Sequence, residues 1–333
     1  MKKGNIKAIT LMNALLCFCV VAVHLTSWPL SSLSQDSLQY IIIFAFNKLL
    51  CFSVPAFIFL SGFKLYNKYS DVKIDCRRFF SGRFKKIIVP YVISVLIYFV
   101  YFYSKAWVSL KELPQYVFLG TLSAQFYYVI IAVQFYLLFP VLNGIFKRSP
   151  VLVTVLSFVC TLCCQQYLHF TYSDRFFASY LFYFVFGMFV SAHREKIKKA
   201  VSPCIAICII SGFIHARFSY FSTIGKFFYR YAHVVNIIYV TSAIIVIYGI
   251  CTYLCKKCDG IYRLSAVLSA VSYDVYLYHV LPIAVLQYDI FPRLSLTPGW
   301  QFAVSSVVVL SLIIIYAFIV YTIKRRNQTK HNL

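Results

Sequence analysis

Long apolar segments, separated by short polar loops, make up almost the whole chain. Each segment is about twenty residues long, which is enough to cross about 30 Å of hydrocarbon. A backbone exposed to lipid must satisfy its own hydrogen bonds, so we expect every segment to be a helix. The pattern predicts an all-α polytopic membrane protein, a single membrane-embedded domain over 1–333. We place ten transmembrane helices at 8–30, 38–66, 87–104, 124–146, 150–168, 176–193, 201–217, 231–254, 269–288 and 300–323.

Composition and charge agree with a membrane protein. Apolar residue types make up 61% of the chain and charged types 12%, against about half and a quarter in soluble domains. The net charge of +23 does not indicate a nucleic-acid partner, because the cations sit in short loops between apolar segments. With the N-terminus inside, 24 Lys and Arg residues fall on cytoplasmic segments and 7 on outer loops, which predicts that both termini are cytoplasmic.

Other classes of membrane protein fit less well. Almost all of the nine acidic residues fall in loops or at loop edges, whereas proton-coupled transporters use intramembrane carboxylates. Most cysteines lie in apolar segments as small buried hydrophobes. The Cys255–Cys258 pair has no second pair to complete a zinc site, so we expect no metal.

The first segment carries an unusual polar stripe. Asn13 and His24 are eleven residues apart, so on a helix they lie on one face with about 16 Å between them. An ionisable side chain inside a membrane is costly and is by default a functional hypothesis. His24 could therefore be a general base towards a hydroxyl group, or it could simply hydrogen-bond a neighbouring helix.

Two later segments repeat this polar character. In the ninth, Ser272, Tyr276 and His279 align on one face, and a proline at 282 should end or kink the helix. In the fourth, Gln134 precedes Tyr136, and an amide in lipid seeks a partner, so a helix contact and a substrate contact are equally open.

A cluster of cations lies at the start of the third segment, with Arg83, Lys85 and Lys86 closest to it. These residues could anchor the helix against anionic lipid. Alternatively, Arg83 and Lys86, one helical turn apart, could grip a pyrophosphate.

The order of these motifs resembles the acyltransferase-3 family of bacterial membrane O-acyltransferases. The resemblance rests on His24, on the VPxFxFxSGF segment ending at Phe63, on the junction from Arg83 to Tyr91, and on the QFYLLFP and SYxxYLxH segments that begin at Gln134 and Ser272. Together these motifs span almost the whole chain. The small size is similar to that of family members from exopolysaccharide loci.

The resemblance implies that the protein uses acyl-CoA to acylate hydroxyls of an extracytoplasmic glycan from the bacterial cytoplasmic membrane, and we expect the donor to be acetyl-CoA. It makes His24 the catalytic residue, places the CoA phosphates near Arg83, Lys85 and Lys86, and makes Asn13 a further candidate contact for the donor. Asn13 stands where the family keeps an arginine, and Val133 where it often keeps an acid. These departures are compatible with a different substrate or with lost catalysis.

The main hypothesis is therefore an O-acyltransferase that acts on a cell-envelope or exported polysaccharide. His24 would deprotonate the acceptor or carry the acyl group, while Gln134, Tyr136, Tyr276 and His279 would hold the acceptor or polarise the carbonyl. The alternative is a non-enzymatic exporter or flippase of a polysaccharide or lipid-linked sugar, with aromatic side chains stacking on sugars. A structural or regulatory membrane partner is a third interpretation.

Overall fold

The computed structural model describes residues 3–226 and 232–331. Within these ranges every regular element is a helix and no strand occurs, which confirms the all-α prediction. The main helices are α1 (Lys3–Ser32), α2 (Leu38–Leu50), α3 (Ser53–Tyr69), α4 (Cys76–Arg83), α5 (Val89–Tyr103), α6 (Leu113–Leu119), α7 (Tyr127–Arg148), α8 (Pro150–Tyr167), α9 (Leu181–Ala192), α10 (Arg194–Thr223), α11 (Ala232–Lys257), α12 (Asp259–Tyr278), α13 (Val280–Val285) and α14 (Pro298–His331). Short π-helical turns follow α4 (η1, Phe84–Ile88) and α13 (η6, Leu286–Ile290).

The helices form two compact units. Unit 1 comprises Met1–Ser53, Ile209–Ala232 and Val246–Leu333, and unit 2 comprises Val54–Cys208 and His233–Ile245. Helices α10 and α11 therefore contribute to both units. Each unit is described by itself below.

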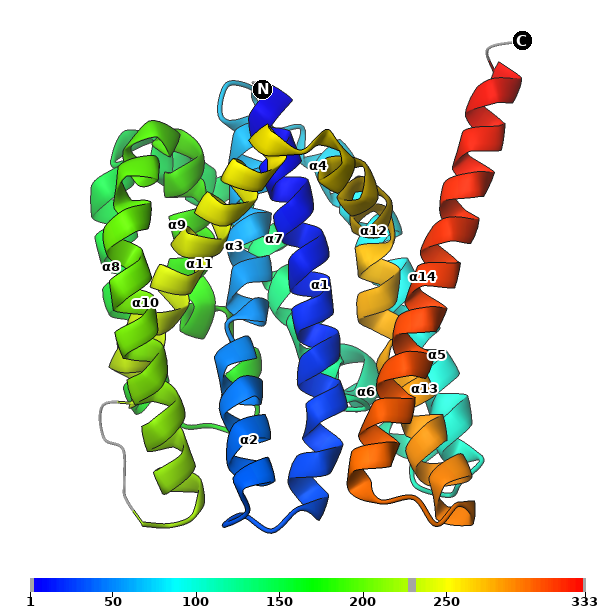
Figure 1. Cartoon of the computed structure of the whole chain (residues 1–333). Helices are drawn as coiled ribbons and strands as arrows, with labels where there is room; N and C mark the ends of the chain where they lie inside the picture. The colour runs from blue at the N-terminus through cyan, green and yellow to red at the C-terminus, as the bar shows by residue number, and fades with distance from the viewer. Residues whose placement is uncertain (1–2, 227–231, 332–333) are drawn as a thin grey trace. The chain divides into compact units, whose positions relative to one another are not determined.

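In unit 1, α1 lies alongside α2, α12 and α14 (Figure 1). Polar contacts join these apolar helices at several levels. The indole Nε1 of Trp28 donates to Oε1 of Gln301 at 2.8 Å, which ties α1 to α14. At the opposite end of α1, the Nζ of Lys7 lies 2.7 Å from a carboxylate oxygen of Asp259, at the start of α12.

In unit 2, α3 and α9 approach so closely that glycine is required on both. A Cβ added to Gly62 would lie 2.0 Å from the carbonyl oxygen of Phe184, and one added to Gly187 would lie 2.1 Å from that of Phe59. Small residues that let helix backbones meet are a common device of membrane helix packing. The glycine of the predicted SGF motif thus has a packing role.

The second predicted segment, 38–66, is interrupted, since α2 ends at Leu50 and α3 begins at Ser53, two residues before Pro55. The count of ten spans is not confirmed. Eight helical segments in the described residues are long and apolar enough to cross a membrane, and the bent α12–α13 pair makes up to nine. The predicted span 176–193 corresponds to a shorter apolar helix, Phe177–Ala192, and the first residue of the predicted span 231–254 lies outside the described residues.

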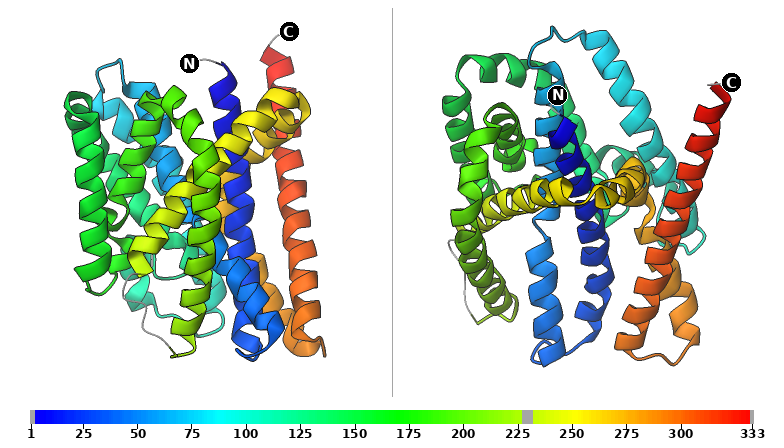
Figure 2. Two further views of the ribbon diagram at one scale, coloured as in Figure 1. Left: turned by 60° about the vertical axis from the view of Figure 1, so that its left-hand side comes forward. Right: turned by 45° about the horizontal axis from the view of Figure 1, so that its top comes forward.

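The start of α1 and the end of α14 both belong to unit 1. In both views of Figure 2 they lie at the same end of that unit. That both termini lie on the cytoplasmic side of the membrane stays a prediction from the Lys and Arg distribution.

Candidate functional site

The polar stripe predicted on the first helix faces α12. The Asn13 amide donates to the hydroxyl oxygens of Ser269 at 3.0 Å and of Ser272 at 2.6 Å. One turn further along α1, the Cys17 thiol lies 3.9 Å from the carbonyl oxygen of Ser272. Because Asn13 and His24 share a face, these contacts also direct His24 towards α12.

His24 and His279 lie together at the far end of this helix pair, with ring centroids 5.0 Å apart and ring planes inclined by 59°. His279 is located where α12 gives way to α13, at a bend of 43°. Pro282 explains this bend, because proline has no N–H and its ring clashes with the preceding turn. The predicted kink after His279 is therefore confirmed, and it places an imidazole at the break in the helix.

The hydrogen bonds of His279 determine its tautomer. Its Nδ1 lies 2.9 Å from the carbonyl oxygens of both Val275 and Tyr276, so Nδ1 carries the hydrogen and donates it. In a neutral ring, Nε2 is then an acceptor. His279 is only 3% exposed, and within the described residues its Nε2 has no hydrogen-bond partner.

His24 is half-buried, and no group in the described part of the chain hydrogen-bonds to its ring nitrogens. The helix turn that carries it is instead held by Asn47 of α2, whose amide donates to the Val23 carbonyl at 2.9 Å and to the Thr26 hydroxyl at 2.8 Å. The fixed backbone and the uncommitted imidazole together suit a group that exchanges a proton with a substrate.

No carboxylate contacts the histidine pair in the described residues. Asp274 is the acid nearest along the α12 sequence, and it accepts a hydrogen bond from the Tyr316 hydroxyl at 2.8 Å. The pair therefore differs from the common arrangement in which an acid orients a catalytic histidine. Within the same ranges, no group of three or more His, Cys, Asp or Glu residues could hold a metal ion.

The cations proposed for CoA binding belong to unit 2. The Arg83 guanidinium lies between two rings, 5.4 Å from the centroid of Phe79 and 5.0 Å from that of Tyr136. Arg83 and Tyr136 also line a pocket of about 360 Å³. Lys85 and Lys86 are exposed.

The π-helical turn η1 changes the predicted geometry of this cation cluster. We expected Arg83 and Lys86 on one face of an α-helix, but residues 84–88 are π-helical, with more residues in each turn. Lys86 is therefore rotated away from the α-helical position above Arg83. The half-buried guanidinium and the exposed ammonium groups have different surroundings, so a shared grip on one pyrophosphate stays a prediction.

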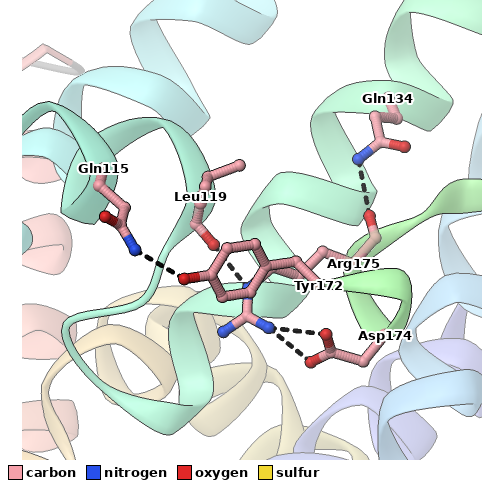
Figure 3. A network of polar contacts seen from close by, with 6 residues as sticks. All are labelled: Gln115, Leu119, Gln134, Tyr172, Asp174 and Arg175. Atoms are coloured by element: carbon pink, nitrogen blue, oxygen red, sulfur yellow. Dashed lines mark hydrogen bonds and ion pairs between the residues drawn. The ribbon is translucent and has the colours of Figure 1, made fainter. Parts of the chain in front are cut away.

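Gln134 takes part in a polar network around Arg175 (Figure 3). Its Nε2 donates to the Arg175 carbonyl at 2.8 Å, and its Oε1 accepts from the Phe177 backbone N–H at 3.0 Å. Arg175 in turn donates to the Leu119 carbonyl at 2.6 Å and pairs with Asp174. The helix-contact interpretation of Gln134 thus has direct support, and its substrate-binding role stays a prediction.

The structure brings some of the predicted residues together within each unit. In unit 1, Asn13, His24, Tyr276 and His279 lie along the α1–α12 pair, and the buried Tyr276 ring lies 6.2 Å from that of His279. In unit 2, Arg83 contacts Tyr136, whereas Gln134 bonds the loop at Arg175. Asn47 was not predicted as a site residue, although an asparagine inside an apolar segment is itself a signal for a buried polar contact.

The helical architecture, the number of apolar spans and the His24–His279 pair define a multi-pass membrane protein with an uncommitted imidazole site. Residues 6–321 match the acyltransferase domain family (acyltransferase-3), so the chain belongs to that family. It is also 28% identical over 303 residues, covering 83% of this chain and 80% of the relative, to a Bacillus subtilis (strain 168) protein named "Putative membrane-bound acyltransferase YfiQ". No solved structure matches the chain.

Proposed function

We propose that this family member transfers an acyl group from cytosolic acyl-CoA, with acetyl-CoA the expected donor, to a hydroxyl of a cell-envelope or exported polysaccharide. The observation that supports this proposal best is the His24–His279 pair, held by the Asn13 contacts and retaining uncommitted ring nitrogens. The protein would work in the bacterial cytoplasmic membrane, with both termini in the cytoplasm.

His24 is the proposed general base. It takes the proton from the acceptor hydroxyl as the oxygen attacks the thioester carbonyl. The new C–O bond forms, the C–S bond breaks, and the proton passes from His24 to the departing thiolate of CoA. His279, whose Nδ1 is bound to the backbone, presents Nε2 as a second acceptor that orients the hydroxyl or the His24 ring.

Arg83 is the proposed contact for the donor's phosphates. Its guanidinium is held by the Phe79 and Tyr136 rings, so less side-chain freedom is lost when it binds an anion. The exposed Lys85 and Lys86 add positive charge nearby in the sequence and would raise the local concentration of an anionic donor.

The test is acyl transfer from labelled acetyl-CoA to a glycan acceptor by the full chain in proteoliposomes. His24→Ala should lower kcat/KM by at least a hundredfold, in line with the usual contribution of a general base. His169→Ala, which alters an exposed histidine whose Nε2 lies 3.2 Å from the Gln166 carbonyl oxygen at the end of α8, is the matched control and should retain the wild-type rate. Wild-type transfer by His24→Ala would contradict the proposed mechanism.

A further inference from the structure

An apolar groove in unit 1 lies between α12–α13 and α14. Its volume is about 590 Å³, and Val285, Leu286, Val308 and Leu312 contribute to its walls. Leu312 is 48% exposed, so the groove opens at the surface of an apolar helix. An engineered cavity of about 150 Å³ is large enough for benzene, so this groove has room for a chain of about eight carbons.

His279 lines this groove and also contacts His24. It is nine-tenths buried, and its Nε2 has no hydrogen-bond partner in the described residues, whereas its Nδ1 is fully engaged. A buried polar atom without a partner is costly, and the hydroxyl of the proposed acceptor is a donor that would satisfy this Nε2. The apolar groove thus reaches the imidazole that lies against His24, the proposed general base.

The charge of the groove restricts what can occupy it. Asp274 lines the wall, and no Lys or Arg is among the lining residues in the described part of the chain. The phosphates of a phospholipid or of a lipid-linked sugar would meet a carboxylate without a cation, which is unfavourable. A hydrocarbon chain attached directly to the reacting carbonyl carries no charge, so the Asp274 carboxylate does not repel it.

We propose that this groove binds the hydrocarbon tail of the acyl group being transferred, and that the protein accepts medium-length acyl chains as well as acetyl. The inference rests on the proposed function, since the tail is carried by the thioester whose C–S bond breaks at His24. The tail itself is chemically unchanged. A two-carbon acyl group would leave most of the groove unfilled, whereas an octanoyl chain would exchange water or lipid for apolar walls.

The test compares acetyl-CoA with octanoyl-CoA as donors for the full chain in proteoliposomes. The wild type should transfer octanoyl groups, and Val308→Trp, which fills the groove, should lower the ratio of octanoyl to acetyl transfer at least tenfold. Val307→Trp is the matched control, because Val307 is 65% exposed and does not line the groove. It should retain the wild-type ratio.

Failure of this inference is distinguishable from failure of the proposed function. Acetyl transfer that depends on His24, with octanoyl transfer below a hundredth of it, would overturn the groove assignment and leave the acyltransferase intact. Absence of transfer from every acyl-CoA would overturn both.

A binding measurement keeps the inference testable if Val308→Trp does not fold. Octanoyl-CoA carrying a diazirine at its chain end should crosslink to groove residues such as Leu312. Crosslinks confined to other helices would refute the assignment. So would labelling of the groove by a diazirine phospholipid that octanoyl-CoA fails to displace, because a resident membrane lipid would then be the occupant.

Discussion

Replacing Gly62 by alanine should destabilise unit 2 strongly. The added Cβ would lie 2.0 Å from the Phe184 carbonyl oxygen and 2.9 Å from its carbon, and both atoms belong to the main chain. Real Cβ contacts start near 3.0 Å, so α3 and α9 must separate by about 1 Å. A gap of that size forfeits a quarter to a half of each dispersion contact along the interface.

The expected change in the free energy of unfolding combines two losses and one gain. Overpacking of a close interface costs about 1–3 kcal/mol or more, and lost contacts between the separated helices add to it. Alanine recovers about 1 kcal/mol of helix propensity. We therefore expect a net loss of about 2 kcal/mol or more for Gly62→Ala, and a similar loss for Gly187→Ala, whose Cβ would lie 2.1 Å from the Phe59 carbonyl oxygen.

The assay is unfolding of the purified chain in mixed detergent micelles, with increasing SDS fraction, followed by circular dichroism. Gly144→Ala in α7 is the matched control, because a Cβ there meets nothing within 4 Å. Gly144→Ala should be as stable as the wild type or slightly more stable. Equal stability of Gly62→Ala and Gly144→Ala would refute the close approach of α3 and α9.

Four further substitutions distinguish residues that stabilise the fold from residues that bind substrate. Asn13→Ala removes the amide that bonds two serines of α12 and should lower the free energy of unfolding by about 1–2 kcal/mol in the same assay. Gln134→Leu leaves two backbone groups unpaired and should cost about 1–3 kcal/mol, whereas a change confined to the acceptor KM would contradict a packing role. Arg83→Ala should raise the KM for acyl-CoA about tenfold and Lys86→Ala less, and the reverse order in initial-rate measurements would contradict the Arg83 assignment.

Periodicity predicted much of unit 1. The spacing of Asn13 and His24 placed both on one face of the first helix, and that face lies against α12. Ser272 and His279, which were predicted to share one face of their helix, form the other side of this interface, and Pro282 predicted the bend at His279. These features depend on local helix geometry, which the sequence determines directly.

Other features depended on partners that leave no local signal. Gln134 bonds the backbone of Arg175, forty-one residues away, and any residue type offers a backbone carbonyl. The π-helical turn after Arg83 matches no motif recognisable in the sequence, so the expected α-helical alignment of Arg83 with Lys86 was not met. The predicted number of spans differs from the structure for another reason. The segment Phe177–Ala192 is apolar, so it was predicted as a span, but its helix is shorter than a full crossing.

The substitution of asparagine for the family's usual arginine now has a structural context. Asn13 is 7% exposed, and its amide bonds Ser269 and Ser272. Asn13 thus makes an interhelical polar contact in this chain. Helix geometry places it on the same face as His24, about 16 Å away along the helix axis. It supports the helix pair that carries both histidines, and its contact with the donor stays a prediction.

The most direct test of the account is a double-mutant cycle on the histidine pair. We would measure kcat/KM for acyl transfer in proteoliposomes with His24→Ala, His279→Ala and the double variant. If the two imidazoles act as one unit, the double variant should be no more than a few times slower than the worse single variant, because the second loss removes nothing further. Losses that multiply, or a wild-type rate in either single variant, would contradict the account.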